Sequence, residues 1–564
     1  MKKVLLGLSV VAIVATCYFL FTYSPVQDAT MLLINGMVYT ANDAAPNAEA
    51  VAIRGDRIIG VGSTEEISQA FVSSSIIDLK GKALYPGFID SHGHLENLGT
   101  VMMTLNLMGT SSIADIRSLV AERVRLSKPG EWVRGRGWDQ NKWETKNFPM
   151  ARDLDDVSGD VPVYLERVDG HAVWVNSKVL QIVGITKETK DPDGGKLLRD
   201  AAGNPTGVFV DNAIDLLKGA LPSLTQEQRK EAIEKAVHEC SKLGLTGIHD
   251  MGMDLDGISL CKSLIDSGHF PLRAYVAING IGETWSHYLK SGPEIGFGNG
   301  RLTVRAIKLY ADGALGSRGA ALIEPYTDDP TNRGLTLTSE KNVDRVVREA
   351  LEKGFQVCTH AIGDRANHIV LNVYEHAFNS LQNKEQDHRF RVEHAQVIAQ
   401  DDIPRFAKLG VLPAMQPTHC TSDMYWAGDR LGAERIQGAY AWRSLMKHGS
   451  IIPAGSDFPF ENPNPLWGFY AAITRQDHSG WPAEGWNPQE RMTREEALKS
   501  FTIWSAYAAF EENVKGSIEA GKYADLVVLS DDIMKIEPPK ILTTNVVLTI
   551  LAGEVVYSSD KPIQ

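Results

Sequence analysis

Histidine and carboxylate side chains stand out in several short apolar segments of this sequence. Asp90, His92 and His94 lie in the string Asp-Ser-His-Gly-His, and residues two apart point to the same face of a β-strand. That spacing suits two ligands of one metal ion. Taken alone the pair is weak evidence, because a chain with 15 histidines produces such spacings by chance.

Later apolar segments end in the same kinds of residue. A single histidine is more often an ordinary core or surface residue, but polar groups at five strand ends favour one shared site. Imidazole and carboxylate ligands suit Zn, Mn, Fe or Ni, with Zn the default, and we expect one or two divalent ions per chain. Besides His92 and His94, the candidate ligands are Lys308, His360, His394 and Asp457.

A divalent ion in such a site would supply hydrolytic chemistry. It lowers the pKa of bound water and polarises a carbonyl, while a neighbouring carboxylate moves the proton to the leaving group. Asp457, in the string Pro-Ala-Gly-Ser-Asp-Phe-Pro, is the best candidate for that carboxylate. Lys308 has two readings: it snorkels or pairs with an acid, or it reacts with carbon dioxide to give a carbamate that bridges two metals.

The elements that position these residues alternate between short apolar strands and longer helical stretches such as 224–244 and 341–354. This alternation predicts an α/β fold with a (β/α)8 barrel over 84–505, whose strand ends converge on one mouth. An irregular region at about 98–240 reads as an insertion after the first strand. The eight strand candidates are 83–94, 244–251, 272–278, 304–313, 355–364, 389–396, 409–417 and 451–459.

Both ends of the chain have a different character. Residues 31–83 read as short strands in antiparallel hairpins, and 506–564 contain similar strands, so the two flanks are expected to form one small β-domain. Residues 1–28 carry two lysines and then an apolar run, which predicts an export signal or a membrane anchor, with lipidation at Cys17 as an alternative. We therefore expect a cell-envelope protein that is exported and contacts the membrane through this segment only.

The composition narrows the classes of partner. The formal charge of −13 argues against nucleic acid, because phosphate binding needs a basic face. The 5 cysteines include no Cys-x-x-Cys pair, so neither a disulfide scaffold nor a zinc ribbon is indicated. A small-molecule substrate fits best, and a homodimer remains open.

Seven strings together resemble the amidohydrolase superfamily, specifically family 3 with its YtcJ-like hydrolases. They are PGFIDSHGH, RVDGHAVWVNS, KLYADGALGSRGA, THAIGD, RVEHAQ, AGSDFP and GSIEAGKYADLVVL, and they occur in order over about 31–560. The resemblance implies a TIM-type barrel, with a small β-sandwich domain built from both chain ends. It also implies a metal-dependent hydrolase acting on amide-type C–N bonds.

The same resemblance assigns roles to single residues. His92 and His94 match the metal pair of the first strand, and His360 and His394 match the ligands of strands five and six. Asp457 matches the strand-eight residue that contacts metal and transfers protons, and Lys308 matches the lysine carboxylated in binuclear relatives. A catalytic role for His171, which would polarise the carbonyl or orient the substrate from the insertion, is weighed against a loop held by its own hydrogen bonds.

The leading expectation is hydrolysis of an N-acyl, N-formyl or cyclic amide by a metal-activated hydroxide. An ester, lactone or carbamate hydrolase using the same site is the near alternative. A non-catalytic envelope protein that binds a ligand and keeps the metal for stability is a different class, and a mononuclear deaminase is a weaker third idea. Further residues that could line the pocket, or else serve packing, are Trp138, Asp139, Trp143, Trp426 and Asp429.

Overall fold

The computed structural model describes residues 26–559, apart from 129, 169, 171, 193–194, 218 and 381–386. Contacts divide the chain into two compact units: the larger comprises the chain up to Leu95 and from Val237 onward, and the smaller is Glu96–Ala236. Within the described residues, none of the helices has the length and apolar character needed to cross a bilayer. The predicted signal or anchor lies almost entirely outside those residues.

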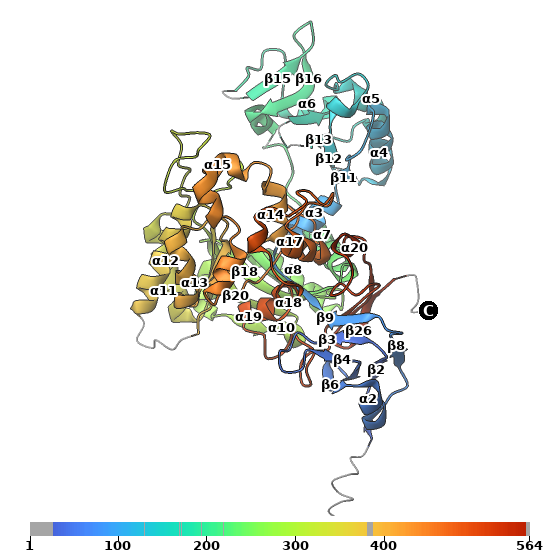
Figure 1. The fold of residues 1–564 in the computed structure, drawn as a ribbon. Helices are drawn as coiled ribbons and strands as arrows, with labels where there is room; N and C mark the ends of the chain where they lie inside the picture. Colours follow the sequence, from blue (N-terminus) through green and yellow to red (C-terminus); the bar gives the residue numbers. More distant parts are fainter. Residues whose placement is uncertain are drawn as a thin grey trace, which may run out of the picture. The chain divides into compact units, whose positions relative to one another are not determined.

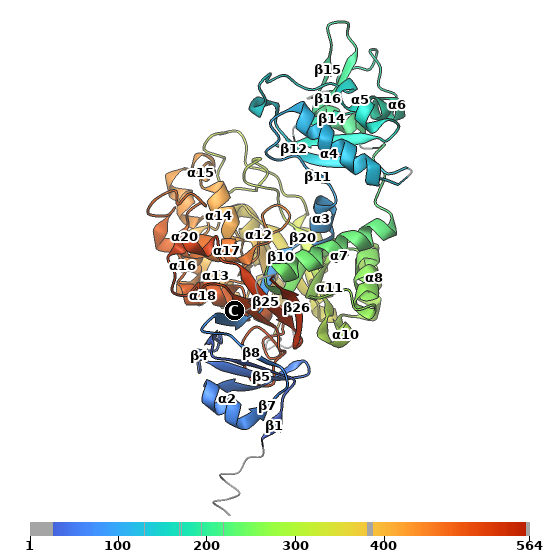
Figure 2. The same cartoon turned by 90° about the vertical axis from the view of Figure 1, so that its right-hand side faces the viewer.

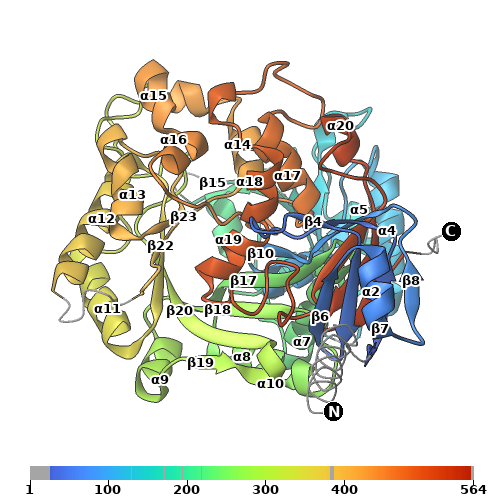
Figure 3. The ribbon, with the colours of Figure 1, turned by 60° about the horizontal axis from the view of Figure 1, so that its bottom comes forward.

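The larger unit contains a barrel of parallel strands, which confirms the predicted α/β barrel class (Figure 3). A short antiparallel strand, β19 (Glu294–Gly296), pairs with the edge of β20 at Val304. In order around the sheet, the parallel strands are β10 (Phe88–Gly93), β17 (Leu245–Met253), β18 (Arg273–Asn279), β20 (Leu302–Tyr310), β21 (Gln356–Ala361), β22 (Arg391–His394) and β23 (Leu412–Ala414).

The helices between these strands arise from ordinary sequence signals. In α11 (Glu340–Lys353), for example, Ser339 caps the first turn, Gly354 ends the helix with a φ of 78°, and the buried residues recur at helical spacing. The unit boundaries fall at the start of α3 (Leu95–Met102) and within α7 (Gln226–Lys242). Other helices of the larger unit are α8 (Leu255–Asp266), α9 (Glu283–Ser291), α10 (Phe297–Gly300), α12 (Asp364–Asn379), α13 (Ile403–Leu409), α14 (Pro417–Asp423), α15 (Ala427–Arg435), α16 (Trp442–Lys447), α17 (Pro465–Thr474), α18 (Arg494–Ser500), α19 (Ile503–Ala508) and α20 (Pro538–Ile541).

The predicted first strand, 83–94, is in fact two strands in different sheets. β9 (Ala83–Pro86) pairs with strands of the flanking region, whereas β10 enters the barrel. Gly87 makes the transition: a Cβ at this position would lie 2.2 Å from the Thr246 hydroxyl, so only glycine passes so close to the neighbouring strand.

The predicted eighth strand, 451–459, is irregular and was wrong as a regular strand. It forms isolated bridges at Ala454 and Phe458, and Ser91 N–H donates to the Ala454 carbonyl across 3.0 Å. Two features prevent a regular ladder. The Ser456 N–H bonds to the Asp90 carboxylate instead of a strand, and Asp457 has a φ of 60°, in the left-handed region. We refer to residues 451–459 as the closing segment.

Strands from both chain ends form two sheets, of order β26-β25-β24-β9-β3-β4 and β6-β5-β2-β8. One hydrophobic cluster contains residues of both sheets, including Leu33 and Ile53 from the second sheet and Leu84 and Val528 from the first. The remaining strand bounds are β2 (Met31–Ile34), β3 (Met37–Tyr39), β4 (Asn47–Ala48), β5 (Ala50–Arg54), β6 (Arg57–Gly62), β8 (Ile76–Asp78), β24 (Leu526–Leu529), β25 (Val546–Leu551) and β26 (Glu554–Ser558), with a further small pair, β1 (Gln27–Asp28) and β7 (Phe71–Val72).

The predicted hairpins are only partly right. β5 and β6 form an antiparallel hairpin, as do β25 and β26, but β2 and β3 lie in different sheets on either side of Asn35-Gly36. Their partners β8 and β9 run parallel to them. Asn-Gly therefore marks a corner here, with Asn35 at a φ of 56°. A helix that we did not predict, α2 (Thr64–Ala70), begins at a capping box of Ser63 and Glu66.

The smaller unit, Glu96–Ala236, is built on a six-stranded sheet of order β11-β12-β13-β14-β16-β15, with α4 packed on β11 and β12 (Figures 1 and 2). Trp138 and Trp143 are buried in its core cluster together with Trp174, so these tryptophans serve packing. The element bounds are β11 (Leu105–Asn106), α4 (Ile113–Leu126), β12 (Val133–Trp138), η1 (Gln140–Lys142), α5 (Arg152–Ser158), β13 (Val163–Arg167), β14 (Ala172–Val175), α6 (Ser177–Val183), β15 (Gly195–Arg199), β16 (Pro205–Asp211) and η2 (Asn212–Leu217).

Candidate metal centre

The histidines of the first strand meet the carboxylate of the closing segment. His94 Nε2 lies 3.2 Å and His92 Nε2 lies 3.5 Å from Asp457 Oδ1. Lys308 Nζ approaches His92 Nε2 to 3.2 Å. The carboxyl ends of β10 and β20 thus bring together side chains more than 200 residues apart, which is the arrangement expected at the mouth of a barrel.

The histidines of strands β21 and β22 complete the group. The ring centroids of His360 and His394 are 4.6 Å apart, and those of His92 and His394 are 4.8 Å apart. The structure therefore brings the six predicted ligands into one cluster. Four of these residues are buried, so the cluster lies at the base of the mouth: His92, Lys308, His394 and Asp457.

One further histidine belongs to the cluster and was missed. His419 lies on α14, its Nε2 is 3.8 Å from Asp457 Oδ2, and its ring stacks on that of His394 at a centroid distance of 6.0 Å. The available signal was its place, two residues after the predicted seventh strand. We overlooked it because it stands on a helix rather than at a strand end.

The donor atoms fit a divalent metal. Two groups, His92–His94–Asp457 and His394–His419–Asp457, each have ligand atoms within 4.8 Å of one another. Among the described residues, His360 Nε2 and Asp457 Oδ1 are buried and make no well-aligned hydrogen bond, although His94 Nε2 lies 3.2 Å from Asp457 Oδ1 and Asp312 Oδ1 lies 3.5 Å from His360 Nε2. Buried polar atoms are rarely left in this state, so their openness supports a role as metal ligands. Asp457 is shared by both groups.

The other ring nitrogens of two candidate ligands are already engaged. His92 Nδ1 lies 2.6 Å from Glu393 Oε2, and His394 Nδ1 lies 2.7 Å from Gln416 Oε1. Carboxylate and amide oxygens accept from the Nδ1–H, which leaves Nε2 with its lone pair for a metal. Glu393 and Gln416 therefore select the tautomer that a ligand needs.

The electrostatics of the cluster favour neutral imidazoles. Burial, followed by the positive charge of Lys308, lowers the pKa of His92 well below its ordinary value, and burial has the same effect on His394. Burial and Lys308 lower the pKa of His360 to about 3. Burial also lowers the pKa of Lys308, with Glu393 opposing this shift. Neutral imidazole is the form that binds a metal ion.

The backbone is strained where two of the ligands stand. His394 has a φ of 70° and Asp457 a φ of 60°, in the left-handed region that non-glycine residues seldom adopt. Asp90 fixes the closing segment beside them: its carboxylate accepts from the N–H groups of His92 and Ser456 and from the Ser456 hydroxyl. Burial raises the pKa of this carboxyl group to about 7.

The remaining predicted residues have different outcomes. His171 lies outside the described residues. Asp139 caps the helix that follows it and pairs with Arg167 at 3.0 Å. Asp429 is exposed on α15, and Trp426 lies against Gly316, where an added Cβ would meet the indole at 3.2 Å.

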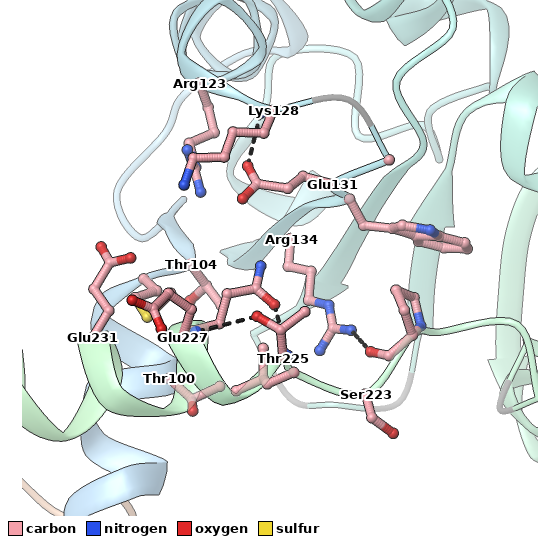
Figure 4. A pocket seen from close by; sticks show the side chains of 16 residues that line it. Thr100, Thr104, Arg123, Lys128, Glu131, Arg134, Ser223, Thr225, Glu227 and Glu231 are labelled. Carbon is pink, nitrogen blue, oxygen red and sulfur yellow. Dashed lines mark hydrogen bonds between the residues drawn. The ribbon is translucent and has the colours of Figure 1, made fainter. Parts of the chain in front are cut away.

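A cavity of about 360 Å³ lies in the smaller unit (Figure 4). Its lining mixes basic and acidic side chains, among them Arg123, Arg134, Glu227 and Glu231. The Arg134 guanidinium is partly satisfied by the Pro222 carbonyl at 2.6 Å. The described residues that line this cavity include no histidine or cysteine, so their chemistry differs from that at the mouth of the barrel.

Comparison with known proteins agrees with this chemistry. The chain is 35% identical to the putative amidohydrolase YtcJ of Bacillus subtilis, over 93% of this chain and 98% of that protein. It is 26% identical to an N-substituted formamide deformylase of Arthrobacter pascens, over 94% and 99% of the two chains. An uncharacterized metal-dependent hydrolase from Pyrococcus furiosus has a similar structure, with a TM-score of 0.73 and 28% identity over 90% of this chain and all of that one.

These likenesses support a metal-dependent hydrolase and bear out the resemblance found in the sequence motifs. The model of the amidohydrolase family matches residues 75–557, which include the barrel, the smaller unit and, from the flanking sheets, β8, β9, β24 and β25. The chain belongs to the amidohydrolase family.

Proposed function

We propose that this protein hydrolyses an amide-type C–N bond in a small molecule, either an N-acyl, an N-formyl or a cyclic amide. The observation that carries the proposal is the position of Asp457, which belongs to both groups of ligand atoms and whose buried Oδ1 makes no well-aligned hydrogen bond among the described residues. The similarity to an N-substituted formamide deformylase supports the choice of bond.

In this proposal the residues at the mouth divide the work. His92, His94, His360 and His394 would hold a divalent ion as neutral imidazoles. Such an ion would lower the pKa of a coordinated water and polarise the substrate carbonyl. Asp457 Oδ1 accepts the proton of the attacking water and delivers it to the leaving nitrogen. This protonation is needed because an unprotonated amide nitrogen is a poor leaving group.

Lys308 is proposed to react with carbon dioxide to give a carbamate, whose oxygens would serve as ligands if two ions are bound. Burial lowers the pKa of its ammonium group, which favours the neutral amine that attacks carbon dioxide. The nitrogen forms a bond to the carbon of carbon dioxide while one C=O π bond opens to a carboxylate oxygen, and the nitrogen releases one proton to water. The product offers two carbamate oxygens as possible metal ligands in place of one nitrogen. Without that reaction, Lys308 would remain an amine 3.2 Å from His92 Nε2.

An ester, lactone or carbamate hydrolase is the second candidate, since the same residues would activate water toward any of these carbonyls. A non-catalytic metal-containing envelope protein that binds a ligand is the third. We also retain the proposals of an exported, membrane-tethered protein and of a homodimer. Analysis of the processed N-terminus and of the mass in solution tests these two.

Metal analysis of the protein and of its Lys308→Ala variant, both purified without chelators, tests the site. We expect close to two divalent ions per chain, falling in the variant. One ion, unchanged in the variant, would give Lys308 a structural role and favour mononuclear chemistry. An unloaded wild-type protein that also fails to take up added Zn²⁺ would contradict the proposal.

Paired substrates then test the bond. A panel of N-formyl, N-acyl and cyclic amides is assayed beside esters and carbamates with the same acyl groups. Faster turnover of the amides is expected. If only the esters or carbamates are hydrolysed, the second candidate replaces the first, and if the metal-loaded protein turns over nothing in the panel, the binding protein does.

A further inference from the structure

Beneath the candidate metal ligands, a buried arginine of β22 contacts two other strands of the barrel, β10 and β17. Arg391 stands at the start of β22 with none of its surface exposed. Its Nη2 donates to the Ser91 carbonyl of β10 across 2.7 Å, and its Nη1 lies 2.8 Å from His249 Nδ1 of β17. In the sheet order β10-β17-β18-β20-β21-β22-β23, β22 is adjacent to neither β10 nor β17, so this side chain crosses the barrel interior.

The same guanidinium also holds the carboxylate that contacts a candidate ligand. Arg391 Nη2 donates to Glu393 Oε2 across 2.9 Å, and Arg391 Nε lies 2.7 Å from Glu393 Oε1. Glu393, likewise fully buried, lies with Oε2 2.6 Å from His92 Nδ1. A continuous line of contacts therefore runs from Arg391 through Glu393 to His92.

We propose that Arg391 is a positioning residue for the metal site: it fixes the Glu393 carboxylate and the β10 backbone so that His92 keeps its Nδ1–H and presents Nε2 to the ion. This inference rests on the proposed metal centre and concerns how that centre is held.

The geometry explains why arginine is needed. Its planar guanidinium directs donors at the Glu393 carboxylate, the Ser91 carbonyl and the His249 ring at the same time, whereas a lysine ammonium is a single point on a flexible stem. If Glu393 turns away, His92 Nδ1 loses the carboxylate that accepts its proton in the described part of the chain, and only Lys308 Nζ, 3.2 Å from Nε2, still favours the same tautomer. The alternative tautomer places the proton on Nε2, where it blocks metal binding.

The test compares metal affinity in Arg391→Lys and Glu393→Gln with that of the wild type. Zn²⁺ dissociation constants are measured by chelator competition, and the visible spectrum of Co²⁺-loaded protein reports ligand geometry. Changes to the partners of metal-binding histidines typically weaken affinity by about 10- to 100-fold, and we expect this range with an altered Co²⁺ spectrum. The double variant should bind Zn²⁺ about as tightly as the single variant with the lower affinity, because the two residues act as one unit.

Arg273→Lys is the matched control. Arg273 is 1% exposed and pairs with the buried Asp525 at 2.7 Å, but it begins β18 and stands at the opposite end of the strands from the candidate ligands. This variant is expected to lower the unfolding temperature and leave Zn²⁺ affinity unchanged.

Three outcomes would overturn the proposal. If Arg391→Lys and Arg273→Lys lower the unfolding temperature alike and both bind Zn²⁺ as the wild type does, Arg391 has only a structural role. The same conclusion follows if the losses of affinity in the Arg391 and Glu393 variants simply add. Failure of the wild-type protein to bind Zn²⁺ or Co²⁺ would overturn the metal centre itself, together with this inference.

Discussion

A buried ion pair at the amino end of the barrel strands and the candidate ligands at the carboxyl end differ in how their polar atoms are paired. At the amino end, Arg273 Nε and Nη2 donate to the two oxygens of Asp525 across 2.7 and 3.1 Å, and Ala552 N–H donates to the same carboxylate across 2.9 Å. At the carboxyl end, Asp457 Oδ1 and His360 Nε2 are buried but make no well-aligned hydrogen bond among the described residues.

This difference in hydrogen bonding distinguishes residues that stabilise the fold from residues that are free to bind a ligand. A buried charged group whose hydrogen bonds are all made helps to define one structure. A buried polar atom without a good hydrogen bond lowers the stability of the fold until a ligand binds it. The mouth tolerates such atoms because Glu393, Gln416 and Asp90 hold the surrounding groups in place.

The largest effect is expected from Asp457→Asn. The amide keeps the shape of the carboxylate but cannot take the proton of the attacking water, so kcat should fall by about 100- to 10,000-fold. Four histidines remain to hold the ion, so metal content and unfolding temperature should change little. Steady-state kinetics and metal analysis measure these effects, with the exposed Asp429→Asn as control. A kcat within a few-fold of wild type would remove Asp457 from catalysis.

At the amino end, Asp525→Ala should act on stability instead. It leaves Arg273 buried without its anion, a change that typically costs about 3–5 kcal/mol of unfolding free energy. Denaturant unfolding measures the loss, and metal content should be retained. Asp344→Ala, which removes an exposed ion pair within α11, is the control and should cost less than about 1 kcal/mol. Equal losses in both variants would erase the contrast between the buried and exposed pairs.

A smaller effect is expected where the closing segment meets β10. A Cβ at Gly455 would lie 2.5 Å from His92 N and 2.6 Å from Asp90 Oδ1, so Gly455→Ala must shift one of the two segments. We expect a loss of about 1–3 kcal/mol and weaker Zn²⁺ binding. In Gly428→Ala the added Cβ has no neighbour within 4 Å, so this control should bind Zn²⁺ normally. Normal binding by Gly455→Ala would show that the segment tolerates the shift.

The smallest effect concerns acid. Burial raises the pKa of Asp525, but the Arg273 guanidinium outweighs it and the pKa lies below its ordinary value in the folded protein. The ionised group therefore adds stability above its unfolded pKa of about 3.9, and this stability is lost as pH falls through the folded pKa. The stability difference between wild type and Asp525→Ala should accordingly shrink below about pH 4. Urea unfolding across this range tests the sign, and a difference that grows in acid would contradict it.

Pattern in the sequence predicted most of the barrel, and the failures have physical causes. The alternation of apolar segments and helices located β17 to β23, because buried parallel strands are nearly continuous apolar runs. It merged β9 with β10 because apolar character continues through Pro86-Gly87, although the chain changes sheets there. It made 451–459 a regular strand because the string is apolar, and the left-handed conformation of Asp457 leaves no mark on composition.

The candidate ligands were easier to predict from the sequence than the residues that hold them in place. Residues at strand ends could be collected from the sequence once a barrel was assumed, as His360 and His394 were. His419 escaped because it lies on α14, and nothing in one sequence predicts which helix residue faces the mouth. The contacts of Arg391 with Ser91 and His249 depend on the closure of the barrel, which is a property of the fold rather than of any local segment.

The bond between Asp90 and Ser456 also has a consequence for synthesis. These residues are 366 positions apart, and they join the first barrel strand to the closing segment. A ribosome delivers His92 and His94 early and Asp457 only after almost all of the barrel has emerged. The two early histidines must therefore spend most of translation without the residue that completes their site, and binding of an ion at full strength can begin only when the last part of the barrel has left the ribosome.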